Sequence, residues 1–434
     1  MNVPGIPTRS PAPAALAAAL MLAVAGCSAG PAPAPSASSP SSAVSSPAAS
    51  SPAASFPAAS SPAASSDAAL QEFDQAALEQ TFRDAAQELR VPGAVMLLRT
   101  PGGNLTYTYG VRTFGGTDPV TPADHVRIGS ITKTWTTTVI LQLVQEGKIK
   151  LQDAVADYRP DVPNGANITI EQLLTMRSGL YNYTEALDVN QVLDADPGKA
   201  WTPEELLAAA FRHPPYFAPG EGFHYSNTNT VLLGLIAEAL DGKPLTAAFR
   251  DRLFTPLGLT GSVFPEQASN AIPEPHPQGY MYGNNVLTLD HPALPEDMQK
   301  SAADGTLQPT DQTAMNPSWA WAAGSGISTA EDLATWAEAL GGGKVLNPAL
   351  QKQRLDSPQP VKADDPGGAL YGLGIAKFGK LFGHTGELPG FNSFAGHDPA
   401  AQVTLVVWTN LAPTPDGRDP ATTIARTLIG KIYR

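Results

Sequence analysis

The 434-residue chain is 42% hydrophobic and 15% charged, so it holds enough apolar sequence for two domains or for one large domain of two lobes. Its formal net charge of −13 argues against nucleic acid as a partner, because the phosphate backbone binds basic surfaces. The chain has one cysteine, so no disulfide can form within it, and its stability has to come from a hydrophobic core.

Residues 1–26 are typical of an export signal. One charged side chain, Arg9, precedes the apolar stretch 14–25, which is shorter than a membrane-spanning helix. The stretch ends in Val-Ala-Gly directly before Cys27, which resembles a bacterial lipobox. The resemblance implies lipidation of Cys27, and hence a protein anchored to the outer face of a bacterial cytoplasmic membrane or secreted into the cell-wall space. An ordinary secretory signal with an incidental cysteine is the alternative.

Residues 27–66 predict a disordered tether. They are almost wholly Ala, Ser and Pro, and the near-repeat Ser-Pro-Ala-Ala-Ser recurs along them. Such a composition cannot bury a core, so the segment is expected to be disordered or to resemble polyproline II. In extended form it would reach on the order of 100 Å, enough to hold a folded domain away from a membrane.

The folded part is expected to begin with a helix at 67–90, where apolar residues recur at helical spacing. Pro92-Gly93 ends this helix, and residues 94–98 predict a buried strand. A Gly-Gly turn then leads into a second strand at 105–111. Helix and strands together indicate an α/β or α+β arrangement.

A helix is predicted after Gly129, because apolar residues recur at helical spacing as far as Val144 and Gly147 is a natural stop. Ser130 lies in its first turn and Lys133 follows three positions later, which puts the hydroxyl and the amine on one face. The unpaired N–H groups of a helix N-terminus suit a developing oxyanion. The pattern predicts a serine nucleophile with a lysine partner. A capping serine beside a solvated lysine is the alternative.

The middle of the chain, from about 151 to 316, predicts an all-helical lobe inserted into the sheet lobe. Its last part, 271–316, is rich in Pro, Gly, Asn and Asp and is expected to form long loops, which in compact domains are usually functional. The chain then returns to a capped helix from 328 to about 341, to strands and to a final helix. The predicted helices of the middle part are 170–176, 203–212, 230–240 and 245–253; the late strands are 371–378, 380–385, 392–396 and 403–409, and the last helix is 420–429.

Two stretches offer the pattern Tyr-x-Asn. Tyr225-Ser226-Asn227 leads straight into the predicted helix 230–240, which is a rigid platform for a catalytic group. Tyr282-Gly283-Asn284 lies among glycine and asparagine and predicts a loop. A tyrosine near Ser130 would need a cationic neighbour to lower its pKa from about 10 before it acts as a base.

A third stretch, Gly383-His384-Thr385-Gly386, lies on a predicted late strand. Small residues on an edge strand let an extended ligand pair with the strand backbone. His384 is then placed to supply a titratable cation to the site. A strand-end histidine beside a turn is the alternative.

Taken together and in this order, the motifs at Ser130, Tyr225 and His384 resemble the S-x-x-K, Y-x-N and H-T-G signature of the penicillin-recognising serine hydrolases. Supporting stretches lie at 127–129, 177–181 and 254–259. The match points to the branch of class C β-lactamases and D-alanyl-D-alanine carboxypeptidases and covers residue 67 to the C-terminus. It implies a two-lobed β-lactamase-like fold of α/β type, with a mixed, mainly antiparallel sheet flanked by helices and an inserted all-helical lobe.

The resemblance also implies a role for each matching residue. Ser130 attacks the carbonyl and forms an acyl-enzyme, while Lys133 and Tyr225 pass its proton to the leaving amine, with the choice of base left open. The backbone N–H groups of Ser130 and Glu387 form the oxyanion hole. The residues expected to bind substrate are Asn227, His384, which should also polarise Tyr225, Thr385, Gly386 and Trp319. No cofactor and no metal are implied.

The function implied most directly is D-alanyl-D-alanine carboxypeptidase activity on cell-wall peptides, with reactivity toward β-lactams. A class C-like β-lactamase or an esterase is one alternative, and a tethered penicillin- or muropeptide-binding protein with little turnover is another. Glu387 departs from the carboxypeptidase pattern, because it repels a substrate carboxylate unless Lys377 or a loop cation compensates. An amidase, peptidase or esterase acting on neutral or cationic substrates therefore stays open.

We expect a monomer that takes a small peptide, ester or β-lactam substrate and meets the membrane only through its lipid anchor. The sequence has no H-E-x-x-H helix and no G-x-x-x-x-G-K-[ST] loop, which argues against zincins and P-loop NTPases.

Overall fold

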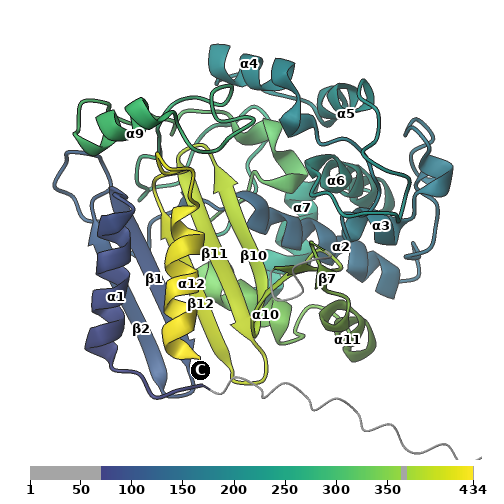
Figure 1. Ribbon diagram of the computed structural model, residues 1–434. Helices are drawn as coiled ribbons and strands as arrows, with labels where there is room; N and C mark the ends of the chain where they lie inside the picture. Colours follow the sequence, from purple (N-terminus) through teal and green to yellow (C-terminus); the bar gives the residue numbers. More distant parts are fainter. Residues whose placement is uncertain (1–69, 363–368, 434) are drawn as a thin grey trace, which may run out of the picture. The chain divides into compact units, whose positions relative to one another are not determined.

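Strands from both ends of the chain form one sheet at the centre of the fold. The computed structural model describes residues 70–362 and 369–433, and in these ranges an eight-stranded antiparallel sheet runs in the order β2-β1-β12-β11-β10-β9-β8-β7 (Figure 1). The N-terminal hairpin joins the C-terminal strands where β1 pairs with β12, with Ala94 opposite Thr409. The strands are β1 Gly93–Thr100, β2 Gly103–Gly110, β7 Gln359–Pro360, β8 Leu370–Tyr371, β9 Ala376–Phe378, β10 Leu381–Leu388, β11 Phe391–Asp398 and β12 Val403–Thr409.

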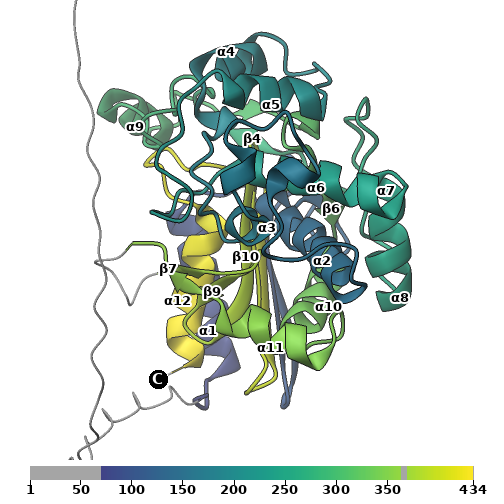
Figure 2. The same ribbon diagram turned by 90° about the vertical axis from the view of Figure 1, so that its right-hand side faces the viewer.

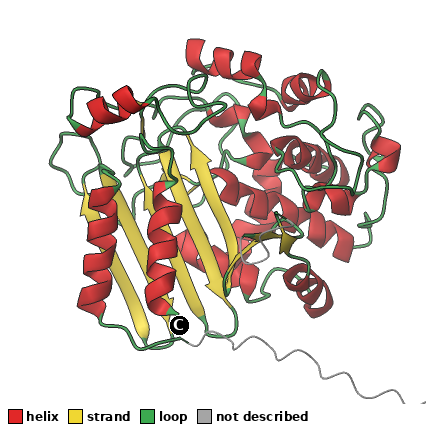
Figure 3. Ribbon diagram, in the orientation of Figure 1, coloured by secondary structure: helices red, strands yellow, loops and turns green. Residues whose placement is uncertain are grey.

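Helices cover both faces of this sheet (Figures 1 and 3). Helices α1 (Gln75–Glu88) and α12 (Pro420–Ile432) lie side by side on one face, and α10 (Ala330–Gly341) lies on the other. Because side chains of a strand alternate between faces, Met96 of β1 packs with α1 and α12 whereas Leu97 enters the opposite core. Both faces of the central strands are therefore buried.

Several further helices, among them α2, α3, α5, α6 and α7, gather beyond strand β10 at one side of the sheet (Figures 1 and 2). Two short strand pairs, β3 with β6 and β4 with β5, lie outside the eight-stranded sheet. The bounds are α2 Thr132–Gln145, α3 Ile170–Leu174, α4 Leu187–Ala195, α5 Pro203–Phe211, α6 Asn227–Asp241, α7 Leu245–Phe249, α8 Thr255–Leu257, α9 Glu296–Ala303, α11 Pro348–Asp356, β3 Val126–Arg127, β4 Tyr280–Met281, β5 Thr310–Asp311 and β6 Ile327–Ser328.

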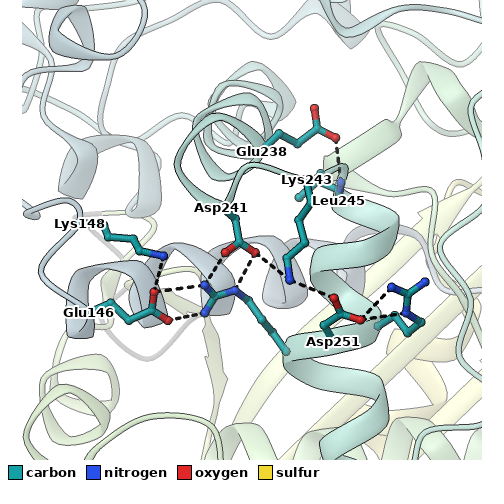
Figure 4. A network of polar contacts seen from close by, with 9 residues as sticks. Glu146, Lys148, Glu238, Asp241, Lys243, Leu245 and Asp251 are labelled. Atoms are coloured by element: carbon teal, nitrogen blue, oxygen red, sulfur yellow. Dashed lines mark hydrogen bonds and ion pairs between the residues drawn. The ribbon is translucent and has the colours of Figure 1, made fainter.

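A network of ion pairs holds the C-terminal ends of α2 and α6 together (Figure 4). Arg252, in the π-helical turn Arg250–Phe254, donates to Glu146 just after α2 at 2.5 Å and to Asp241 at the end of α6 at 2.6 Å. The hydrogen bonds from Arg252 lower the pKa of Glu146 to about 2. This network fixes the relative position of two helices whose N-terminal ends carry the candidate site.

The expected fold class, a mainly antiparallel sheet flanked by helices, is confirmed. Two local predictions were wrong. Residues 271–316 are not all loop, because they hold the strands β4 and β5 and the helix α9, whose first turn is acidic. The strand predicted at 371–378 is broken into β8 and β9, because Gly374 turns with φ +63 and lies so close to α2 that a Cβ on it would be 2.1 Å from Thr137 Oγ1. Helices α4 and α11 were not predicted.

The predicted signal peptide, the lipidated Cys27 and the tether lie outside the described residues. Within 70–362 and 369–433, no helix combines the length and the apolar character needed to cross a membrane.

Candidate active site

Ser130 lies in a 3₁₀ turn, Gly129–Ile131, that leads directly into α2. Gly129 has φ +51, and a Cβ on it would lie 2.3 Å from the backbone N of Glu387 on β10, so only glycine permits this close approach. The Thr132 hydroxyl closes the turn by donating to the Gly129 carbonyl at 2.7 Å. Ser130 itself is partly exposed. The predicted nucleophile therefore lies against the sheet and within reach of solvent.

Lys133 is fully buried beside this serine, with Nζ 2.9 Å from Ser130 Oγ. The amine also donates to Asn227 Oδ1 at 2.6 Å and to the Ala323 carbonyl at 2.8 Å. Burial lowers the pKa of Lys133 well below 10.5. A neutral amine has two N–H donors, which the two carbonyl oxygens accept, and one lone pair, which is left for the serine hydroxyl. Lys133 is therefore suited to take the proton of Ser130.

Tyr225 lies two residues before α6, with its ring centroid 4.8 Å from Lys133 Nζ. Its hydroxyl is buried and has no hydrogen-bond partner among the described residues. Burial raises the pKa of Tyr225, and the nearby Ser130 hydroxyl lowers it only in part. The expectation that a neighbouring cation lowers this pKa was wrong. The raised pKa favours the protonated form of Tyr225, which suits donation of a proton to a leaving group better than it suits the role of base.

His384 on β10 is buried and neutral. Its Nδ1 lies 2.6 Å from the Thr385 carbonyl, and its Nε2 lies 3.3 Å from the hydroxyl of Tyr371. Burial is the main cause that lowers the pKa of His384 to about 3. The expected cation at this position was therefore wrong. The centroid of this ring lies 6.1 Å from that of the Tyr225 ring, and the hydrogen bonds of His384 go to Thr385 and Tyr371.

The backbone of β10 runs against the Ser130 turn. A Cβ on Gly386 would lie 1.9 Å from the Ile128 carbonyl, so the H-T-G glycine is required by this approach. Ser393 of β11 holds the same carbonyl by donating to it at 3.0 Å. The backbone N of Glu387 thus comes close to the turn that carries Ser130, as an oxyanion hole built from these two N–H groups requires.

The Glu387 side chain lies on the solvent side of this strand and forms an acidic pair with Asp419, the residue that precedes α12. Asn392 donates to Glu387 Oε2 at 3.2 Å. The surrounding protein and the Asp419 carboxylate raise the pKa of Glu387 well above 4.5, although Glu387 remains exposed. The two carboxyl groups therefore lie close together at this end of β10, and their proximity favours a proton on Glu387.

The other predicted substrate-binding residues are placed as follows. Asn227 is held at both ends of its amide, by Lys133 and through its own donation to Thr184 Oγ1 at 3.0 Å, so it positions the base. Thr385 is partly exposed beside His384. Trp319, at the end of the turn Pro317–Trp319, is partly buried, and its contact with substrate stays a prediction.

The structure brings the three expected motifs together and leaves the second Tyr-x-Asn stretch out, because Tyr282 packs in the core on the α1 and α12 side of the sheet. Asp419 and Tyr371 were not predicted from the sequence motifs. Both lie near the site in space but outside the three motifs in the sequence. A single sequence carries no signal for either, since their roles depend on how α12 and β8 are placed beside β10.

Comparison with known proteins identifies the family. A family model described as Beta-lactamase matches residues 78–429. The chain belongs to the beta-lactamase family. Two curated relatives are Penicillin-binding protein 4 of Amycolatopsis lactamdurans, 32% identical over 45% of this chain and 51% of its own length, and the D-aminopeptidase of Brucella anthropi, 30% identical over 46% of this chain and 38% of its own length. The match thus spans about half or less of each relative.

The solved D-stereospecific amidohydrolase from Streptomyces sp. covers more of this beta-lactamase family protein. It is 32% identical, has a TM-score of 0.69, and the alignment covers 83% of this chain and 98% of that chain. Family membership and the Ser130 and Lys133 geometry together identify a serine hydrolase.

Proposed function

We propose that this beta-lactamase family protein hydrolyses the amide bond of D-amino acid substrates that carry a free amino group. The observation that supports this substrate class is the acidic pair of Glu387 and Asp419, because Glu387 also supplies a backbone N–H at the expected oxyanion position. A negative charge at this end of β10 attracts an ammonium and repels a carboxylate. The names of two relatives, a D-aminopeptidase and a D-stereospecific amidohydrolase, agree with this class.

In the proposed reaction, the neutral amine of Lys133 takes the proton of Ser130 while Oγ attacks the amide carbon. The carbonyl oxygen becomes an oxyanion between the N–H groups of Ser130 and Glu387. Tyr225 donates its proton to the leaving nitrogen and regains one from Lys133, so the amine departs neutral and an acyl-enzyme remains. A water molecule then attacks the ester carbon and gives a proton to Lys133. Lys133 returns this proton to Ser130 Oγ as the ester C–O bond breaks, so the acid is released and both side chains are restored.

The experiment is a panel of four alanine derivatives incubated with the protein: D-alanine amide, L-alanine amide, N-acetyl-D-alanine amide and an N-acylated D-alanyl-D-alanine. We expect D-alanine amide to be cleaved with at least a ten-fold higher kcat/KM than N-acetyl-D-alanine amide, and L-alanine amide to be poor. Ser130→Ala is the control and should abolish turnover of all of them. Equal values of kcat/KM for D-alanine amide and N-acetyl-D-alanine amide would show that the acidic pair does not select substrates with a free amino group.

Carboxypeptidase activity is the second candidate, favoured by the H-T-G motif and by the relative named Penicillin-binding protein 4. Release of D-alanine from the N-acylated dipeptide would support it over the amidase. Labelling by a fluorescent penicillin without turnover of any substrate would instead support a tethered binding protein, and rapid cleavage of a chromogenic ester or of a β-lactam ring would support an esterase or a β-lactamase.

We also propose that the protein is exported and anchored through lipid at Cys27. This rests on the sequence before Cys27 alone. In a bacterial host, Cys27→Ala should lose incorporation of labelled fatty acid and leave the membrane fraction. Unchanged fractionation would favour an ordinary secretory signal.

A further inference from the structure

A buried tyrosine outside the three motifs lies directly beside His384. Tyr371, on β8, is 4% exposed, and its hydroxyl lies 3.3 Å from His384 Nε2. Its ring is nearly perpendicular to the His384 ring, at 5.6 Å and 89°, and to the Tyr225 ring, at 6.0 Å and 88°. Tyr371 therefore packs against both aromatic groups that lie near the amine of Lys133.

The hydrogen bonds of His384 define its tautomer. A backbone carbonyl can only accept, so the 2.6 Å contact between Nδ1 and the Thr385 carbonyl places a hydrogen on Nδ1. The Nε2 atom of the neutral ring then has a lone pair, and the Tyr371 hydroxyl is placed to donate to it. Burial of the ring opposes a second proton on it.

The turn between β8 and β9 fixes Tyr371 relative to the catalytic helix. Gly374 in this turn packs directly on Thr137 of α2. The fully buried Arg354 donates to the Gly374 carbonyl at 3.3 Å and to Thr138 Oγ1 at 2.8 Å. Since α2 also carries Lys133, the turn and the base belong to one packed unit.

We infer that Tyr371 is a positioning residue: by occupying the Nε2 lone pair of His384, it leaves the unpartnered Tyr225 hydroxyl free to serve the reacting serine and the leaving group. The inference rests on the serine chemistry proposed above. Without the Tyr371 hydroxyl, Nε2 is a buried acceptor that has lost its donor, and the cost of leaving it unpaired drives the Tyr225 hydroxyl to turn toward it. The Tyr225 hydroxyl then donates a hydrogen bond to His384, and its proton is less available to the leaving group.

The test is Tyr371→Phe, with Tyr433→Phe as the matched control. Tyr433, the residue after α12, also has a buried hydroxyl, which donates one hydrogen bond to Asp398 Oδ2 at 2.9 Å. Tyr433 takes no part in the site. We expect kcat to fall about ten-fold in Tyr371→Phe with KM within about two-fold, because general-acid transfer is impaired and binding is not. Tyr433→Phe should lower the melting temperature and leave kcat unchanged.

A second readout needs no substrate. In ¹⁵N NMR spectra of the histidine rings, with His384 assigned through His384→Gln, the wild-type protein should show a protonated Nδ1 and an unprotonated Nε2 that accepts a hydrogen bond. In Tyr371→Phe the Nε2 resonance should shift. A folded Tyr371→Phe protein with wild-type kcat, or a wild-type ring protonated on Nε2, would overturn the inference.

The results of these experiments distinguish failure of the Tyr371 inference from failure of the proposed function. If no amide substrate is cleaved by the wild-type protein, the substrate class is wrong, and the rate of Ser130 acylation by a fluorescent penicillin takes the place of kcat. That acylation rate should then fall in Tyr371→Phe and stay unchanged in Tyr433→Phe. If amides are cleaved equally fast by both variants, the positioning role of Tyr371 is wrong and the proposed function stands.

Discussion

Neutralising the acidic pair, with Glu387→Gln and Asp419→Asn together, tests the basis of the proposed substrate class. Glutamine keeps the backbone N–H of the oxyanion position and can still bond to Asn392. Because the pKa of Glu387 is raised beside Asp419, Glu387→Gln by itself mimics the protonated form of this side chain and leaves Asp419 unchanged. We therefore expect the single variant to be nearly silent and the double variant to show the effect.

The size of that effect follows from Coulomb's law. An ammonium about 5 Å from one negative charge gains roughly 3 kcal/mol at an effective dielectric constant of about 20 and under 1 kcal/mol in bulk water. Both carboxyl residues are exposed, so the larger figure has to be discounted for solvent screening. We expect a loss of about 1–2 kcal/mol, which is roughly a ten-fold decrease in kcat/KM for the substrate with a free amine.

The assay compares kcat/KM for D-alanine amide and for N-acetyl-D-alanine amide at low and at high salt. The double variant should lose activity only on the free amine, and the loss should shrink as salt screens the charge. Glu296→Gln with Asp297→Asn, an exposed acidic pair in the first turn of α9, is the control for net charge and should change neither rate. An equal loss on both amides would refute the electrostatic reasoning, because it would indicate damage to the oxyanion hole.

Three further predictions follow from single contacts. Because burial lowers the pKa of Lys133, activity should fall as pH drops through that depressed value, and Lys133→Arg, which stays protonated, should lose about 10²–10⁴ in kcat at every pH; an active arginine variant would exclude Lys133 as the base. Arg252→Met should cost about 2 kcal/mol of unfolding free energy at pH 7. The pKa of Glu146 in the folded protein is about 2, so the stability that Glu146 contributes is fully present above about pH 4.5 and is lost as the pH falls toward 2. The melting temperatures of the wild-type protein and of Arg252→Met should therefore converge as the pH approaches 2. A difference in melting temperature that stays constant with pH would argue against the ion pair. Gly129→Ala should prevent acylation by a fluorescent penicillin, since its Cβ would lie 2.3 Å from Glu387 N; labelling at the wild-type rate would show that β10 need not approach so closely.

Local patterns were sufficient for elements that carry strong periodicity. The strand 403–409 agrees with β12 to the residue, and the helix of Lys133 lies within a residue or two of its predicted bounds, because long apolar runs leave few alternatives. Helix α9 was hidden among turn-forming residues and has only Ala302 fully buried, so its apolar pattern is weak. The break between β8 and β9 depends on contact with α2, which no local pattern reports.

The sequence predicted which side chains react, but it did not predict their protonation states. Spacing along a helix places the Ser130 hydroxyl and the Lys133 amine on one face, which is a local property. That Tyr225 and His384 meet them was implied by the resemblance to the penicillin-recognising serine hydrolases. Whether Lys133 is neutral, Tyr225 keeps its proton and His384 stays uncharged depends on how much water and how many charges surround each group. Those surroundings come from segments far apart in the chain, packed at distances that only the folded molecule sets.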